Sequence, residues 1–362
     1  MNELLHRFKL GNDAELLLEK RGGGYEKVAT VPIGSQALGV TSSAQGVTKW
    51  DVEGAAITGH VTYSALPKLN NHLRADGKVY SISAYPGLAR RLGRVCNGIS
   101  AFATRSTTND RSWVSACWSP ELMLFVAVAY SGTGNRVMTS PDGIVWTQRA
   151  SAADNSWRSV CWSPELMLFV AVAYSGTGNR VMTSPDGIVW TQRASAADNS
   201  WRSVCWSPEL MLFVAVAETG TGNRVMTSPD GIVWTLRASA ADNVWRSVCW
   251  SPDLLMFVVV SSDGAGNRVM TSPDGITWTA RTSAADNAWR DVCWATQLSL
   301  FVAVASSGTG NRVMTSPNGI NWTARTSAAD NAWQSVCWTG VLGLFVAVAD
   351  SGTGNRVMTS PD

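Results

Sequence analysis

Residues 157–200, WRSVCWSPELMLFVAVAYSGTGNRVMTSPDGIVWTQRASAADNS, decide the fold of this chain because the segment recurs end to end. Its leading tryptophan returns every 44 residues, at Trp113, Trp157, Trp201, Trp245, Trp289 and Trp333. A fixed period of this length is typical of repeat architectures, in which each unit buries its apolar faces against its neighbours. The 44-residue unit is therefore the element from which most of the fold must be built.

Within this unit, turn residues separate four short segments of strand-forming residues. Residues 157–162 and 180–183 are rich in aromatic and β-branched types, which favour strands. Residues 168–173 contain no polar side chain; periodicity alone would allow a helix, but so short a run between turns favours a strand buried on both faces. Residues 188–193 follow a Ser-Pro-Asp-Gly turn at 184–187 and form the fourth segment. Four antiparallel strands per unit, in tandem, predict an all-β protein, a β-propeller with four-stranded blades.

The two ends of the array favour a closed ring over a linear solenoid. The last unit stops at Asp362, where its fourth strand would begin, and residues 97–112, just before the first full unit, match that strand. Pairing these segments would close the ring and remove two exposed sheet edges, which otherwise promote aggregation. We therefore expect a six-bladed propeller, with five contiguous blades from Trp113 and a sixth from Trp333 completed by residues 97–112. A chain that is simply cut short is the alternative.

The first 94 residues do not repeat, and their composition differs from that of the rest. They contain all three histidines and all six lysines of the chain. This contrast predicts a small N-terminal domain of β or α+β structure at residues 1–94 and the propeller at residues 95–362. The extreme N-terminus has no signal-peptide core, which predicts synthesis without secretion through that route.

The end of the N-terminal region, DGKVYSISAYPGLARRLG at residues 76–93, is similar to a segment of bacteriophage tail-fibre and tail-collar proteins. Pro86 and Gly93 would bracket a short helix, because proline suits a helix start and glycine suits its end. The resemblance implies that the N-terminal domain attaches to the virion or to an assembly partner, after synthesis in a bacterial cytoplasm. A capped helix in any small domain is the alternative.

A turn of Ser-Pro-Asp-Gly-Ile-x-Trp type recurs in the five complete repeats and resembles the Asp-box of sialidases and related propellers. In that family the box is a structural staple, in which the carboxylate bonds the turn backbone and the tryptophan caps the hairpin. The resemblance implies the fold, and it does not imply catalysis. The matching residues are Ser140, Asp142 and Trp146, Ser184, Asp186 and Trp190, Ser228, Asp230 and Trp234, and Ser272, Asp274 and Trp278, with Asn318 replacing the aspartate in the fifth copy.

A hydrolytic site is not expected in a propeller of near-identical copies. Glycosidases need a pair of carboxylates, and sialidases use an arginine cluster with a Tyr–Glu pair. The glutamates of the propeller are Glu121, Glu165, Glu209 and Glu218, of which the first three are copies of one turn residue. Its two tyrosines, Tyr130 and Tyr174, are also copies, so a ring of copies offers no singular acid–base pair. We expect no enzyme activity, with an Asp-box glycosidase as one alternative and a purely structural assembly propeller as the other.

Composition restricts the cofactors and partners. A net charge of +2 and a charged fraction of 15% argue against nucleic acid as a partner. The chain has no apolar stretch of about 18 residues, which argues against membrane insertion. Six of the seven cysteines fall at one repeat position, without CxxC spacing or a nearby histidine. We therefore expect free, buried thiols, no metal and no other cofactor.

Two repeated residue types are expected to serve the fold. Arg136, Arg180 and their copies open the third strand and should pair with aspartates such as Asp154 and Asp198; a basic ring is the alternative. Trp118, Trp162 and Trp206 should pack between blades in preference to stacking on sugars.

Equivalent loops on one face of the ring suit multivalent binding. Because strands alternate in direction, the loop after the second strand shares a face with the loop that joins two blades. Polar and aromatic side chains there suit hydroxyl-rich ligands, and ordinary solvated loops are the alternative. The candidate ligand-binding residues are Tyr130, Asn135, Asp154, Asn155, Tyr174, Asn179, Asp198, Asn199, Glu218, Asn223 and Asp350. We expect a non-enzymatic phage tail-fibre or receptor-binding protein whose partner is a host surface glycan or protein.

Overall fold

The computed structural model describes residues 111–340 and 342–362 and, nearer the N-terminus, the backbone of five short strands. The chain divides into two compact units, Met1–Ile99 and Ser100–Asp362. The described strands of the first unit are β1 (Leu5–Lys9), β2 (Glu15–Arg21), β3 (Gly24–Ala29), β4 (Val31–Ile33) and β5 (Gln36–Leu38). They pair in the orders β1-β2-β3 and β4-β5. The segment at 76–93 that resembles tail-fibre proteins lies outside the described residues.

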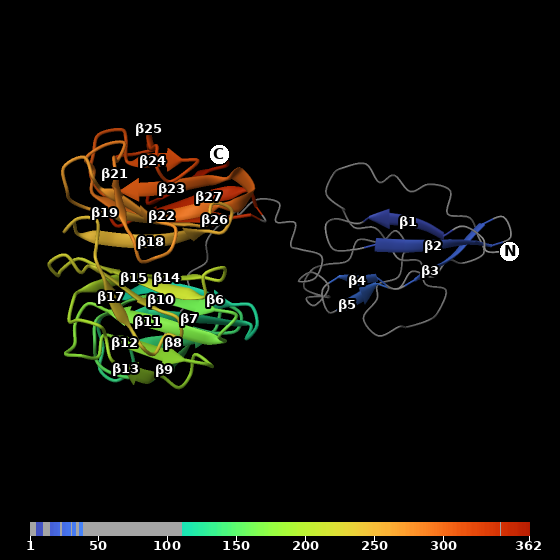
Figure 1. Cartoon of the computed structure of the whole chain (residues 1–362), viewed down its shortest axis with the longest axis horizontal. Coiled ribbons are helices and arrows are strands. Elements are labelled where there is room, and N and C mark those ends of the chain that lie inside the picture. Colours follow the sequence, from blue (N-terminus) through green and yellow to red (C-terminus); the bar gives the residue numbers. More distant parts are fainter. Residues whose placement is uncertain are drawn as a thin grey trace. The chain divides into compact units, whose positions relative to one another are not determined.

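The second unit is a β-propeller of antiparallel blades (Figure 1), which confirms the predicted fold class. The first strands of the six blades are β6 (Trp113–Ser119), β10 (Trp157–Ser163), β14 (Trp201–Ser207), β18 (Trp245–Ser251), β22 (Trp289–Ala295) and β26 (Trp333–Thr339). The second strands are β7 (Leu124–Ala129), β11 (Leu168–Ala173), β15 (Leu212–Ala217), β19 (Met256–Ser261), β23 (Leu300–Ala305) and β27 (Leu344–Ala349). The third strands are β8 (Val137–Ser140), β12 (Val181–Ser184), β16 (Val225–Ser228), β20 (Val269–Ser272), β24 (Val313–Ser316) and β28 (Val357–Ser360). The fourth strands are β9 (Thr147–Arg149), β13 (Thr191–Arg193), β17 (Thr235–Arg237), β21 (Thr279–Arg281) and β25 (Thr323–Arg325). A single turn of 3₁₀-helix, η1 (Thr296–Leu298), precedes β23.

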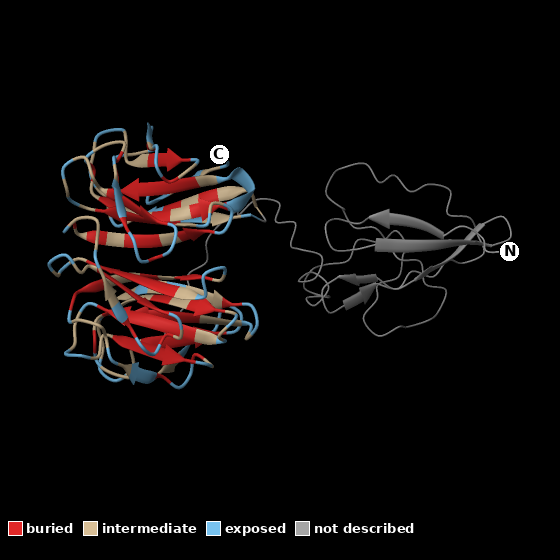
Figure 2. Cartoon of the chain, in the orientation of Figure 1, coloured by how far each residue is buried: buried red, intermediate tan, exposed pale blue. Residues whose placement is uncertain are grey.

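The first strand of each blade lies at the propeller axis. From β6 to β26, each first strand packs against the first strand of the next blade along the chain. A hydrogen bond from a backbone N–H to a side-chain oxygen links each of these neighbours, as when the N–H of Val160 donates to Ser115 Oγ at 3.2 Å. From β7 to β23 the second strands are largely buried on both faces, as their apolar sequence predicts, whereas β27 of the last blade is partly exposed. Figure 2 shows buried residues in red along the strands of the blades.

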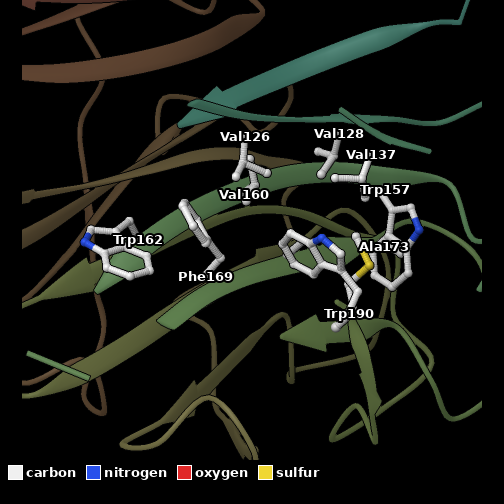
Figure 3. Close-up of a cluster of buried hydrophobic side chains, with 11 residues drawn as sticks. Val126, Val128, Val137, Trp157, Val160, Trp162, Phe169, Ala173 and Trp190 are labelled. Atoms are coloured by element: carbon white, nitrogen blue, oxygen red, sulfur yellow. The ribbon is translucent and has the colours of Figure 1, made fainter. Parts of the chain in front are cut away.

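The core consists of repeated layers between neighbouring blades. In the layer drawn in Figure 3, Val126, Val128 and Val137 of the first blade pack against Trp157 and Trp162 of the second. Trp157 is fully buried, and Trp162 is 7% exposed. The expectation that the tryptophans pack between blades is therefore confirmed for Trp162 and Trp206, whereas Trp118 is only partly buried and contacts Phe125 of its own blade.

The fourth strand is shorter than predicted. It begins at Thr191, so the prediction of a strand from residue 188 was wrong at its start. The carboxylate of Asp186 accepts hydrogen bonds from the backbone N–H groups of Ile188 and Val189, at 2.8 and 2.9 Å. These N–H groups are used within the turn and cannot join the ladder with β12.

The face between the last and first blades is less buried than the five other interfaces. Trp113 is partly exposed, whereas its five copies are fully buried. On the last blade, Val348 is 44% exposed, although its five copies are fully buried. The described part of the last blade has three strands. Of the segment expected to complete it, residues 97–110 lie outside the described residues.

Candidate binding site

The Ser-Pro-Asp-Gly turns, which resemble the Asp-box and are called Asp-box turns below, form an internally bonded structure at one end of the blades. In the second blade, Ser184 Oγ donates to Asp186 Oδ1 at 3.0 Å and accepts from the N–H of Gly187 at 2.8 Å. The indole of Trp190 donates to the carbonyl of Gly187 at 3.0 Å and is 8% exposed. The same bonds recur at Ser228, Asp230 and Trp234, and at Ser272, Asp274 and Trp278. In the first blade Ser140 and Asp142 make them as well, and Trp146 packs against Phe125 at a centroid distance of 6.2 Å.

The opposite end of the blades carries the predicted ligand face, and a second internal network uses several of the candidate residues there. Asn155 Nδ2 donates to the carbonyl of Asn179 at 2.7 Å, and Asp198 Oδ1 accepts from the N–H of Gly178 at 2.7 Å. Arg180 Nε lies 3.6 Å from Asp198 Oδ1, so the expected local Arg–Asp pairing is confirmed. Asn199 and Asn223 repeat the Asn–Asn bond, Asp154 accepts from the N–H of Gly134, and Asn135 accepts from Arg111 Nε. These side chains therefore shape the loops.

The four other candidates, Tyr130, Tyr174, Glu218 and Asp350, lie next to a ring of residues that the sequence did not single out. These are the second residues of the first strands: Val114, Arg158, Arg202, Arg246, Arg290 and Gln334. In the second blade, Trp157 pairs with Ala173 and Ser159 pairs with Val172, so Arg158 between them has no partner in the ladder. The same irregularity recurs in all six blades. Such a bulge redirects the side chain of the extra residue.

The bulged arginines and the residues that follow the second strands alternate around the axis. We call Arg158, Arg202, Arg246 and Arg290, with Tyr130, Tyr174 and Glu218, the axial arginine cluster. Arg158 Cζ lies 4.2 Å from the ring centroid of Tyr130 and 5.4 Å from that of Tyr174. Glu218 bridges two blades, because it pairs with Arg202 Nε at 2.7 Å and with Arg246 Nη1. Arg290 Nε donates to Ser306 Oγ at 2.7 Å, and Gln334 Nε2 donates to Asp350 Oδ2 at 3.0 Å.

The axial arginine cluster carries an excess of positive charge. The pKa of Arg202 is lowered to about 10, mainly by burial; Glu218 opposes this shift, and the positive charges of Arg246, Arg158 and Arg290 add to it. Burial also lowers the pKa of Arg158 and of Arg290. Within the described residues, Glu218 is the carboxylate in direct contact with these guanidinium groups, and Asp350 acts on Arg290 at longer range. Four cations therefore share two anions at one end of the axis.

One buried carboxyl group, Asp291, breaks the repeat at the axis. It occupies the position of Ser115, Ser159 and their copies, and its oxygens accept from the hydroxyls of Ser247 at 2.6 Å and Ser335 at 2.8 Å. The N–H of Val336 donates to it at 2.9 Å. Burial raises the pKa of Asp291, and these hydrogen bonds oppose that rise. Asp291 thus links three successive blades, and its position between them suits a structural role.

Other chemistry is sparse in the described residues. The six described cysteines are free thiols. Burial raises the pKa of Cys117 to about 11 and that of Cys205 to about 12. No group of three histidine, cysteine or acidic side chains suited to a metal ion occurs in the described part of the chain. No helix among the described residues is long and apolar enough to cross a membrane.

Sequence reasoning missed the arginines because they were read as copies of one repeat residue, and it missed Asp291 because that residue is a single exception among serines. The substitution of Val114 by Arg158 in the next repeat was visible, but the convergence of four such positions depends on the curvature of the ring. A signal was available, because the residue at this position and the one after the second strand both differ between repeats. Comparing the repeats column by column would have placed both on one face.

Comparison with known proteins identifies the fold. No protein-family model matches the sequence, and no curated protein matches it significantly. A GH74 enzyme from Niastella koreensis has a similar structure, with a TM-score of 0.55 and 16% identity over 69% of this chain. The match covers 45% of that enzyme, so this chain spans less than half of its length. The β-propeller domain of Cps50 (Swd1) from Myceliophteria thermophila has a TM-score of 0.50 and 11% identity, over 72% of this chain and 85% of that domain. At these identities the similarity shows a shared β-propeller fold.

Proposed function

We propose that the chain is a non-enzymatic recognition protein of the phage tail-fibre or receptor-binding kind. Its propeller binds a host surface glycan or protein through the face that carries the axial arginine cluster. Its N-terminal domain attaches to the virion or to an assembly partner. The attachment role rests on the resemblance at residues 76–93, and the binding role rests on the geometry of the propeller.

One observation carries the binding role. The position after the second strand, at this face, differs in chemistry between the copies and holds an aromatic, an acidic or a hydroxyl side chain. Its six residues are Tyr130, Tyr174, Glu218, Ser262, Ser306 and Asp350. Residues that hold the blades together, such as the Asp-box serines and the buried tryptophans, repeat almost without change. Divergence at this position gives this face of the ring a surface that is not the same in every blade, which is what specific recognition requires.

The two tyrosines are available for contact at this face. Tyr130 is 38% exposed and Tyr174 is 36% exposed, although both stand beside Arg158. Tyrosine supplies a rigid apolar ring and a hydroxyl at small cost in conformational entropy, and it is enriched in binding surfaces. The blades beneath are held by buried layers, so the binding residues sit on a preformed scaffold.

The buried carboxyl group of Asp291 does not support the glycosidase alternative. Inverting and retaining glycosidases both use two carboxyl groups that flank the scissile bond. Asp291 is fully occupied by serine hydroxyls and backbone N–H groups in the described structure. The similar GH74 enzyme contributes evidence for the fold alone.

The test is binding of the full chain to immobilised bacterial envelope polysaccharides, with released reducing sugar measured in the same wells. We expect binding without sugar release, and at least a tenfold loss in the variant Tyr130→Ala/Tyr174→Ala. The matched control is Val145→Ser/Val189→Ser, which changes exposed residues of the Asp-box turns at the other end of the blades. Sugar release would establish a hydrolase. Undiminished binding by the tyrosine variant would exclude this face as the binding surface.

A further inference from the structure

The side chains of the axial arginine cluster are directed there by a repeated backbone feature. Each bulge leaves the second residue of a first strand outside the ladder, next to the residue that follows the second strand of its own blade and that of the preceding blade. Arg158 therefore stands between Tyr130 and Tyr174, and Arg202 stands between Tyr174 and Glu218. The result is a row of guanidinium groups that four consecutive blades supply to one end of the axis.

Arg158 has an unused donor. Its Nε is buried and has no hydrogen-bond partner within the described residues. Its neighbours are two aromatic rings, which attract a cation through their faces but accept no strong hydrogen bond. A buried guanidinium donor without an acceptor is costly, so an acceptor supplied from outside would stabilise this arrangement.

The excess of positive charge around Arg158 also favours the binding of an anion. Glu218 is shared between Arg202 and Arg246, whose side chains are 22% and 17% exposed. Arg246 and Arg158 are close enough to repel each other, as are Arg202 and Arg290. An incoming anion would reduce this repulsion among the partly buried cations.

We propose that the axial arginine cluster binds an oxyanion group carried by a sugar, with Arg158 and Arg202 as its principal donors. The planar guanidinium group matches carboxylate and phosphate oxygens with two parallel hydrogen bonds. Tyr130 and Tyr174 flank Arg158 and provide ring surface for the apolar face of a sugar. Ser262 and Ser306 add hydroxyl groups on the neighbouring blades. This inference deepens the proposed function and rests on it for the saccharide nature of the ligand.

Calorimetric titration of the full chain with three probes tests the assignment. The probes are an oligogalacturonate, a phosphorylated oligosaccharide of similar length and a neutral galacto-oligosaccharide. We expect the acidic probes to bind at least tenfold more tightly than the neutral one, with an affinity that falls as salt is added. The ratio between the two acidic probes identifies carboxylate or phosphate as the preferred group.

Two variants are expected to change the affinity for acidic probes in opposite directions. Together they distinguish an effect on the site from damage to the fold. Arg158→Gln, which installs the residue that the last blade has at Gln334, should weaken acidic probes at least about tenfold by removing a charge-assisted bond. Glu218→Gln removes the carboxylate that competes for Arg202 and Arg246. This change should increase the affinity for acidic probes severalfold, which a misfolded variant cannot do. Arg325→Gln, an exposed arginine of β25, removes the same charge from the outer strand and should change affinity less than twofold.

The failure of this inference is distinguishable from failure of the proposed function. Equal binding of acidic and neutral probes, unaffected by Arg158→Gln, would overturn the oxyanion site and leave a neutral-glycan receptor in place. Absence of binding by either acidic probe at a concentration of about 10 mM would also overturn the oxyanion site. The binding free energy would then be weaker than about −3 kcal/mol, too weak for a site with two arginine donors. The polysaccharide experiment with the tyrosine variant decides the proposed function independently.

Discussion

Trp113 and Trp201 occupy the same position in two blades, yet we expect their replacement by alanine to destabilise the protein unequally. Trp201 is fully buried among Val170, Val172 and Val181 of the preceding blade. Its indole N–H donates to the carbonyl of Ala197 at 3.1 Å, which fixes the loop that joins the two blades. Trp113 is partly exposed, and its indole nitrogen has no hydrogen-bond partner in the described structure.

The expected magnitudes follow from these environments. Truncation of a fully buried tryptophan to alanine costs about 3–5 kcal/mol, and loss of the indole hydrogen bond adds about 1 kcal/mol. Trp201→Ala should therefore lower the free energy of unfolding by about 4–6 kcal/mol. Trp113→Ala gives up less buried surface and no such bond in the described structure, so its cost should be about 1–2 kcal/mol.

Thermal unfolding of the full chain, followed by far-UV circular dichroism, measures the difference without relying on tryptophan fluorescence. For a domain of this size each kcal/mol lowers Tm by about 2–4 °C. Tm should fall by about 10–20 °C for Trp201→Ala and by less than about 8 °C for Trp113→Ala. Equal losses would refute the reasoning, because they would mean that the face between the last and first blades is as tightly buried as the others.

Three other contacts give further predictions, each checked by urea denaturation. Asp230→Ala should cost about 1–2 kcal/mol because two turn N–H groups lose their acceptor, whereas Asp230→Asn should cost less than about 0.5 kcal/mol, since Asn318 accepts the equivalent bonds in its own blade; equal costs would contradict this. Gly231→Ala should cost about 2–4 kcal/mol, because φ is +73° and the added Cβ would lie 3.0 Å from Leu168 Cδ2; a neutral result would show that the neighbouring blade yields freely. The backbone N–H groups of Val145 and Ile144 hold the pKa of Asp142 below its usual value. The unfolded chain therefore binds that proton first as pH falls, so the contribution of Asp142 is complete above about pH 4 and is lost as pH drops through the lower folded pKa. Asp142→Asn should reduce the loss of unfolding free energy at acid pH. An unchanged dependence of this free energy on pH would contradict the role given to the hydrogen bonds of Asp142.

The blade architecture was predictable because its determinants are local and repeated. The tryptophan period set the blade length, and apolar runs such as residues 168–173 marked the buried second strands. The start of the fourth strand was missed because a side chain competes with the ladder. The carboxylate of Asp186 accepts hydrogen bonds from the N–H groups of Ile188 and Val189, and strand propensity does not account for such side-chain bonds.

The site was predictable only as a face. The alternation of strand directions placed Tyr130, Tyr174 and Glu218 at one end of the blades, and the structure has them there. Comparing the repeats would have placed the arginines on the same face, but contacts such as that of Arg246 with Glu218 could not be inferred in this way, because they join different blades. Several loop candidates, including Asn155 and Asp198, instead hold the loops together through bonds to backbone groups.

A crystal structure of the full chain soaked with an oligogalacturonate tests the central claim most directly. The account predicts sugar density at the axial arginine cluster, with a carboxylate about 3 Å from the guanidinium nitrogens of Arg158 or Arg202 and a ring against Tyr130 or Tyr174. Sugar bound at the Asp-box turns, or at the outer strands with the axial arginine cluster empty, would contradict it.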